Sequence, residues 1–142
     1  EALYRATALS YLVCMYIKEY SGKLSAFCGC AIAAGTGMAC GLVLMRGGDT
    51  DAMKRTINNM ASSITGMICD GAKPSCAMKV SSGVSTAMLS ALMAMEDKVV
   101  TSVEGIIDED VDKSIANLTA IGSKGMEATD RLVLDIMTGK SC

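Results

Sequence analysis

The chain has 142 residues, of which 51% are apolar, and its formal net charge is −2. This length suffices for one domain with its own core. The charge, with no basic stripe, argues against a nucleic-acid-binding surface. The absence of histidine removes the commonest general base and the commonest zinc ligand.

Apolar residues recur at three- and four-residue spacing, which predicts an all-α fold, a compact bundle of about six helices. The first helix is expected over residues 2–20 and the second over residues 24–45. The second is uncharged and rich in Gly and Ala, so we expect a central helix buried by the others. It is also long enough to span a bilayer, which stays an alternative. Its many Gly, Ser and Thr residues lower its hydrophobicity, so burial among other helices is favoured over a position in the membrane.

Four further helices are expected in the rest of the chain. Asp49 or Thr50 caps the third, and Asp108 or Asp110 caps the fifth, which ends near Gly122 before a turn at residues 123–125. Ser81 or Ser82 begins the fourth helix. The last helix covers residues 126–137, with three side chains expected to face inward: Leu132, Val133 and Ile136.

A short loop between two thiols stands out from the helical pattern. It runs from Cys69 to Cys76 and contains Gly71 and Pro74. Gly weakens a helix, and Pro removes a backbone donor and biases the residues before it toward extended geometry. We therefore expect a tight loop that closes just before a new helix, which is a common place for a functional site.

The seven cysteines are scattered and odd in number, and no secretory signal is visible at the start, so we expect reduced thiols and a cytoplasmic protein. Their spacing matches no standard zinc site. A set of cysteines without histidine suits an iron–sulfur cluster better. For any single cysteine, however, burial as a small hydrophobic residue is the simplest interpretation. We expect this role for Cys14, Cys28 and Cys40.

Several long motifs resemble the C-terminal part of the L-cysteine desulfidase family, and more distantly the iron–sulfur L-serine dehydratase alpha chain. They are residues 27–37, 59–73, 76–80, 104–111, 115–118 and 125–131. The resemblance implies a [4Fe–4S] enzyme that eliminates a small group from a β-substituted amino acid without pyridoxal phosphate. L-cysteine would give pyruvate, ammonia and sulfide, whereas L-serine would give pyruvate and ammonia.

The same resemblance implies the domain organisation and the partners. Residues 1–142 are expected to be a single helical domain, the cluster-binding C-terminal part of a longer enzyme whose N-terminal part is absent. The expected partners are an amino-acid substrate and that N-terminal part, and self-association into a homo-oligomer stays open. We expect the fragment to be inactive alone. A helical scaffold without enzymatic activity is the competing hypothesis.

Site residues are also implied by the resemblance. Cys30 and Cys69 are the best candidates for cluster ligands, and an open iron would act as a Lewis acid. Cys76 matches a further loop cysteine, but an upstream ligand outside this chain is an equal alternative. Substrate carboxylate binding is expected from the loop residues Gly71, Ala72 and Lys73, with Lys79 as a further candidate. No catalytic base is identified.

Overall fold

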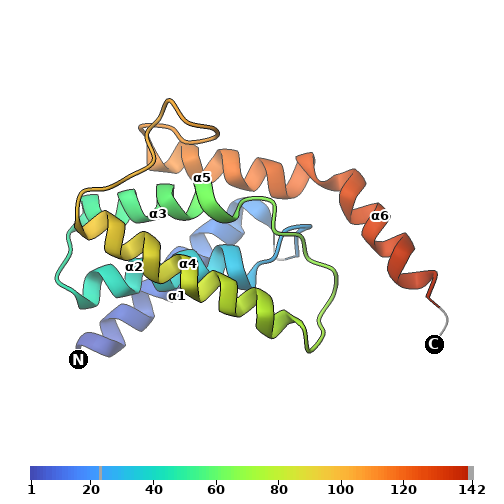
Figure 1. Cartoon of the computed structure of the whole chain (residues 1–142), viewed down its shortest axis with the longest axis horizontal. Coiled ribbons are helices and arrows are strands. Elements are labelled where there is room, and N and C mark those ends of the chain that lie inside the picture. Colours follow the sequence, from blue (N-terminus) through green and yellow to red (C-terminus); the bar gives the residue numbers. More distant parts are fainter. Residues whose placement is uncertain (23, 141–142) are drawn as a thin grey trace.

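The computed structural model describes residues 1–22 and 24–140, and most of these residues are helical (Figure 1). The elements in chain order are α1 (Ala2–Ser21), the π-helical turn η1 (Cys30–Ala34), α2 (Gly35–Met45), α3 (Thr50–Ile64), α4 (Cys76–Met95), α5 (Val111–Ala120), the π-helical turn η2 (Ile121–Gly125) and α6 (Glu127–Thr138). The described residues contain no strand, only one isolated antiparallel bridge between Phe27 and Ile68. The all-α prediction is confirmed.

Helix α2, continuous with η1, is the central element, as expected. It packs against α1, α3 and α4, and glycines allow the backbones to approach closely. A Cβ atom at Gly41 would lie 2.9 Å from the carbonyl oxygen of Ala6 in α1. On the α4 side, a Cβ atom at Gly83 would lie 2.9 Å from the Cα atom of Ala31. The Gly/Ala content of this helix therefore serves close helix packing.

The predicted start of the central helix is wrong. Residues 24–29 form a connecting segment, and the helix begins at Cys30. The reason is a pair of long-range backbone hydrogen bonds, since Cys28 donates to Met67 and Cys69 donates to Ala26. The amide of Cys28 and the carbonyl oxygen of Ala26 are therefore bonded to a different part of the chain. They are not available for helical hydrogen bonds that would extend the central helix toward residue 24. The 11-residue α2 is short for a bilayer, and no helix in the described part of the chain is long and apolar enough to cross a membrane.

The caps of two helices are as predicted. The Asp49 side chain accepts a 2.8 Å hydrogen bond from the amide of Ala52 at the start of α3. At the start of α5, the side chain of Asp110 accepts a 3.0 Å hydrogen bond from the amide of Asp112. These side chains satisfy amides that the first helical turn leaves without a backbone partner.

Two other boundaries differ from the prediction. Helix α4 begins at Cys76 and not at Ser81 or Ser82, because the turn at residues 73–75 leads directly into it. Pro74 is compatible with this position, where a missing amide is not needed. The expected turn after Gly122 is instead the π-helical turn η2, which continues α5. A Cβ atom at Gly122 would overlap the buried ring of Phe27, so glycine there lets the ring pack against η2.

The prediction of an inward apolar face on the last helix is also wrong. Helix α6 extends away from the rest of the molecule, and none of its residues is buried (Figure 1). Leu132 and Ile136 are 60% and 55% exposed, and Val133 is half-buried. Sequence periodicity correctly marks an apolar face here, but this face stays largely exposed, and Val133 and Ile136 line an open cavity opposite the Cys69–Cys76 loop.

Candidate metal and substrate site

The isolated bridge brings the two principal cysteine motifs together. The amide of Cys28 donates a 2.7 Å hydrogen bond to the carbonyl oxygen of Met67, and the amide of Cys69 donates one of the same length to Ala26. Phe27, the single phenylalanine of the chain, anchors this segment in the main core and is 2% exposed. The backbone thus holds Cys69 beside the segment that leads to Cys30.

Cys30 and Cys69 line the same cavity, which has a volume of about 270 Å³. Helix α1 contributes Cys14 and Lys18 to its wall. Cys30 is exposed, whereas Cys14 and Cys69 are half-buried. Burial raises the pKa of the Cys14 thiol, and the nearby Lys18 ammonium acts in the opposite direction. Cys14, expected only to pack in the core, is therefore a third thiol at this cavity.

The cavity does not contain a complete set of metal ligands. Among residues 1–22 and 24–140, no three Cys, Asp or Glu side chains are arranged to hold a metal ion. Cys76, at the start of α4, does not line the cavity, and its Sγ donates to the carbonyl oxygen of Gly71 at 3.4 Å. Cys28 and Cys40 are buried, and burial raises the pKa of Cys40 to about 12. Cys40 does not line the thiol cavity, and burial disfavours the thiolate form that binds metals.

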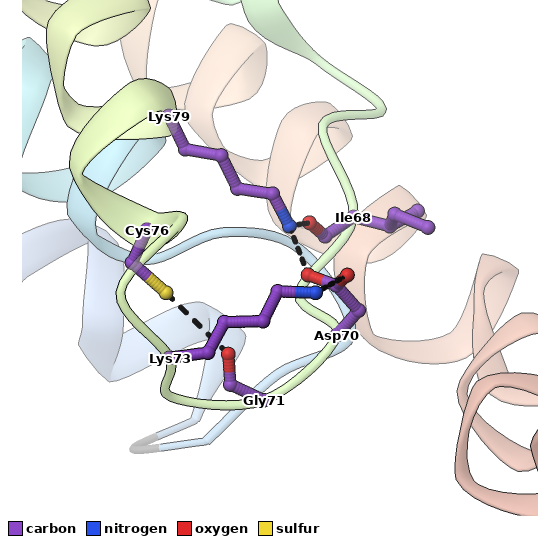
Figure 2. A network of polar contacts seen from close by, with 6 residues as sticks. All are labelled: Ile68, Asp70, Gly71, Lys73, Cys76 and Lys79. Carbon is purple, nitrogen blue, oxygen red and sulfur yellow. Dashed lines mark hydrogen bonds and ion pairs between the residues drawn. The ribbon is translucent and has the colours of Figure 1, made fainter. Parts of the chain in front are cut away.

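Figure 2 shows a polar network within the Cys69–Cys76 loop. The carboxylate of Asp70 pairs with the ammonium groups of both Lys73 and Lys79, and hydrogen bonds from these two lysines hold the pKa of Asp70 well below its usual range. Lys79 also donates a 2.9 Å hydrogen bond to the carbonyl oxygen of Ile68. The network ties the loop to α4 directly beside Cys69.

The network also affects the two lysines that the sequence suggested as carboxylate partners. The pKa of Lys79 is raised, first by its hydrogen bond to Asp70 and to a smaller extent by the nearby thiols of Cys28 and Cys69. Both lysine side chains already contact a carboxylate of the protein itself. Their first role in the structure is to hold the loop.

The predicted substrate-binding residues do not share the thiol cavity. Asp70 and Lys73 line a separate cavity of about 400 Å³ between the loop and α6. Gly71 has φ +91°, and a Cβ atom there would lie 2.6 Å from Cε of Met137 in α6. Ala72 is exposed and lines neither cavity. The structure therefore places Cys30 and Cys69 at one cavity but leaves Gly71, Ala72 and Lys73 outside its lining.

Lys18 is the site residue that the sequence analysis missed. Its ammonium group lies close to Gly29, since a Cβ atom there would be 3.1 Å from its Nζ. A signal did exist in the sequence, because Cys14 and Lys18 are four residues apart on a predicted helix and so share one face. That spacing alone could not show that Cys30 and Cys69 lie opposite them.

Comparison with known proteins identifies the family. Residues 1–135 match the sequence profile described as serine dehydratase alpha chain. The chain belongs to the serine dehydratase alpha chain family. The family assignment agrees with the resemblance found in the motifs around Cys30 and Cys69, and it makes the chain a member of an enzyme family.

Relatives of this family member are found in several bacteria. A "UPF0597 protein" of Parabacteroides distasonis is 75% identical over 142 residues, and one of Phocaeicola vulgatus is 61% identical over 142 residues. A "UPF0597 protein" of Clostridium botulinum is 47% identical over 141 residues. The matches cover 99–100% of this chain but only 33% of each relative. The chain thus spans about one third of the length of these relatives. No solved structure matches it.

Proposed function

We propose that residues 1–142 are the cluster-binding part of a longer iron–sulfur lyase that acts on a small β-substituted amino acid. The preferred reaction converts L-cysteine and water to pyruvate, ammonia and sulfide. The alternative substrate is L-serine, which would give pyruvate and ammonia. The observation that carries the proposal is the presence of Cys30 and Cys69 at one cavity in a member of the serine dehydratase alpha chain family.

The cavity residues fit a cluster whose ligands are shared with another part of the protein. Iron–sulfur clusters are held by cysteine thiolates, and two thiols predicted as ligands face this space. A third ligand would come from outside the 142 residues, with Cys14 as the alternative within them. We regard Cys76 as a supporting loop residue, since its thiol is hydrogen-bonded to Gly71. When bound, such a cluster supplies an iron that can polarise the substrate as a Lewis acid.

Lys18 is the residue that we assign to the substrate carboxylate. Its side chain lines the thiol cavity, and an ammonium group there would lower the electrostatic cost of bringing a carboxylate near two thiolates. Gly71, Ala72 and Lys73 remain predictions from the family resemblance. Lys73 lines the other cavity, whereas Lys18 lines the cavity that contains Cys30 and Cys69.

The remaining residues position the site. The hydrogen bonds of Lys79 to Asp70 and to the carbonyl oxygen of Ile68 hold the loop that carries Cys69. The described lining of the thiol cavity includes no carboxylate. We therefore propose that the group that accepts the α-proton belongs to the part of the enzyme outside this chain.

The deciding experiment is anaerobic reconstitution of the full-length protein, followed by an iron count and parallel assays with L-cysteine and L-serine. Cys30→Ser and Cys69→Ser are each expected to lose most of the bound iron and the activity. Cys40→Ala is the matched control, because its thiol is buried away from the cavity, and it should keep both. Full iron content in Cys30→Ser or Cys69→Ser would contradict the ligand assignment, and an iron-free, inactive wild-type protein would contradict the lyase proposal.

A further inference from the structure

All four tyrosines of the chain lie in α1, and all four side chains are exposed. Tyr4 and Tyr11 share one helical face with Ala8, Leu12 and Met15, at spacings of three and four residues. We call these five residues the outer face of α1. Its large side chains are between 63% and 80% exposed. This surface has the composition of a protein–protein contact, since Tyr and Met are enriched in interfaces.

The packing of α1 on α2 fixes the direction of this face. Glycines of α2 allow close contact with the α1 backbone, and a Cβ atom at Gly37 would overlap the carbonyl oxygen of Ser10. Ala6 and Ile17 are buried. Because the opposite side of α1 is held this tightly, the outer face cannot turn inward without separating the two helices.

The outer face adjoins the thiol cavity. A second cavity of about 180 Å³ is lined by Ser10, Tyr11, Cys14 and Ala34. Cys14 and Ala34 also line the cavity that contains Cys30 and Cys69. A partner seated on Tyr11 would therefore also reach the open side of the candidate cluster site.

The relatives indicate what this partner is. Each aligned relative has about two thirds of its length outside the region that matches this chain. That polypeptide is covalently linked to the matched region, so it is present at a high effective concentration. We propose that the outer face of α1 is the docking surface for the remainder of the same polypeptide. The docking proposal is independent of the proposed function. The additional inference, that the docked part closes the cavity around Cys30 and Cys69, rests on the proposed function.

The proposal is tested by photo-crosslinking in the full-length protein. Tyr11 is replaced by p-benzoylphenylalanine in one sample, and Val103 is replaced in a matched control, because Val103 is 90% exposed on the loop between α4 and α5. Light and heavy isotope-labelled protein are mixed before irradiation, and crosslinked peptides are identified by mass spectrometry. This readout requires neither a cluster nor turnover, so its outcome is independent of the lyase assignment.

The expected result is a crosslink from position 11 to a peptide outside residues 1–142, within one isotopic species and in clear excess over position 103. Met15→p-benzoylphenylalanine, on the same face, should label the same region. Crosslinks that join light and heavy chains would show a second copy on this face and would overturn the proposal. Equal labelling from positions 11 and 103, or no crosslink from positions 11 and 15, would also overturn it.

Discussion

The amide of Cys69 donates a 2.7 Å hydrogen bond to the carbonyl oxygen of Ala26, although the two residues belong to different loops. A second hydrogen bond, from Cys28 to Met67, completes the bridge. The backbone alone therefore sets the position of Cys69 relative to the segment that precedes Cys30. The two cysteine segments are thus held in place by the protein itself, and preorganisation of this kind reduces the entropy lost when a ligand binds.

The contact between Gly122 and Phe27 is expected to support this bridge. In Gly122→Ala, the new methyl group would overlap the Phe27 ring, so the ring and its loop must move. Overpacking of this kind typically costs about 1–3 kcal/mol. Urea unfolding should show this loss of stability. Gly125→Ala is the control in the same turn, since its nearest neighbour would be 3.6 Å away, and a loss as large as that of Gly122→Ala would refute the explanation.

The contact between α1 and α2 is expected to depend on Gly37. In Gly37→Ala, the methyl group would overlap a backbone oxygen, that of Ser10, which cannot rotate away as a side chain can. We expect a destabilisation of about 1–3 kcal/mol, measured by urea unfolding. In Gly35→Ala the nearest atom would be Cε of Met60 at 3.4 Å, and this control should unfold at nearly the wild-type urea concentration. Equal effects of the two substitutions would contradict the close packing.

Stability should depend on the charge of Asp70 at acidic pH. Hydrogen bonds from Lys73 and Lys79 lower the pKa of Asp70 below its ordinary value of 3.8. The carboxylate therefore stabilises the fold fully above about pH 4, and this contribution is lost as the pH falls toward the lower folded-state pKa. The urea midpoint of Asp70→Asn should lie below that of the wild type at pH 7, and the gap should narrow below pH 4. A gap that stays constant or widens on acidification would count against the ion-pair network.

Substrate binding should depend on Lys18 if it holds the carboxylate. In the reconstituted full-length protein, Lys18→Met is expected to raise KM about tenfold or more, because a hydrogen bond to a charged group contributes about 1.5–3 kcal/mol. The kcat should change less, and Lys18→Arg should restore part of the binding. Lys124→Met, on η2, is the control. An unchanged KM in Lys18→Met would exclude Lys18 as the carboxylate partner.

The isolated 142-residue chain is expected to release no sulfide from L-cysteine. No three of its described Cys, Asp or Glu side chains are arranged to hold a metal ion, and the described lining of the thiol cavity includes no carboxylate. The measurement is a sulfide assay after anaerobic reconstitution, with circular dichroism to verify that the chain is helical. Sulfide production at the rate of the full-length protein would show that the site is complete within this chain.

Local features of the sequence were enough to predict the helices and much of the loop. Apolar spacing indicated the all-α fold, and Asp49 and Asp110 were among the predicted caps because short carboxylates satisfy free amides at helix starts. Gly71 and Pro74 marked the loop because both disfavour a continuing helix. The motifs around Cys30 and Cys69 also led to the correct family. All of these inferences depend on residues that are neighbours in the chain.

Only the tertiary structure decided which faces meet. The separation of Cys30 and Cys69 in the sequence does not reveal the Phe27–Ile68 bridge that brings them to one cavity. It also does not reveal that Lys18 lines the same cavity. Likewise, the periodicity of α6 marked Ile136 as part of an apolar face but could not show that its side chain stays 55% exposed. Periodicity determines which residues share a side of a helix, whereas long-range packing and hydrogen bonds determine what lies opposite that side.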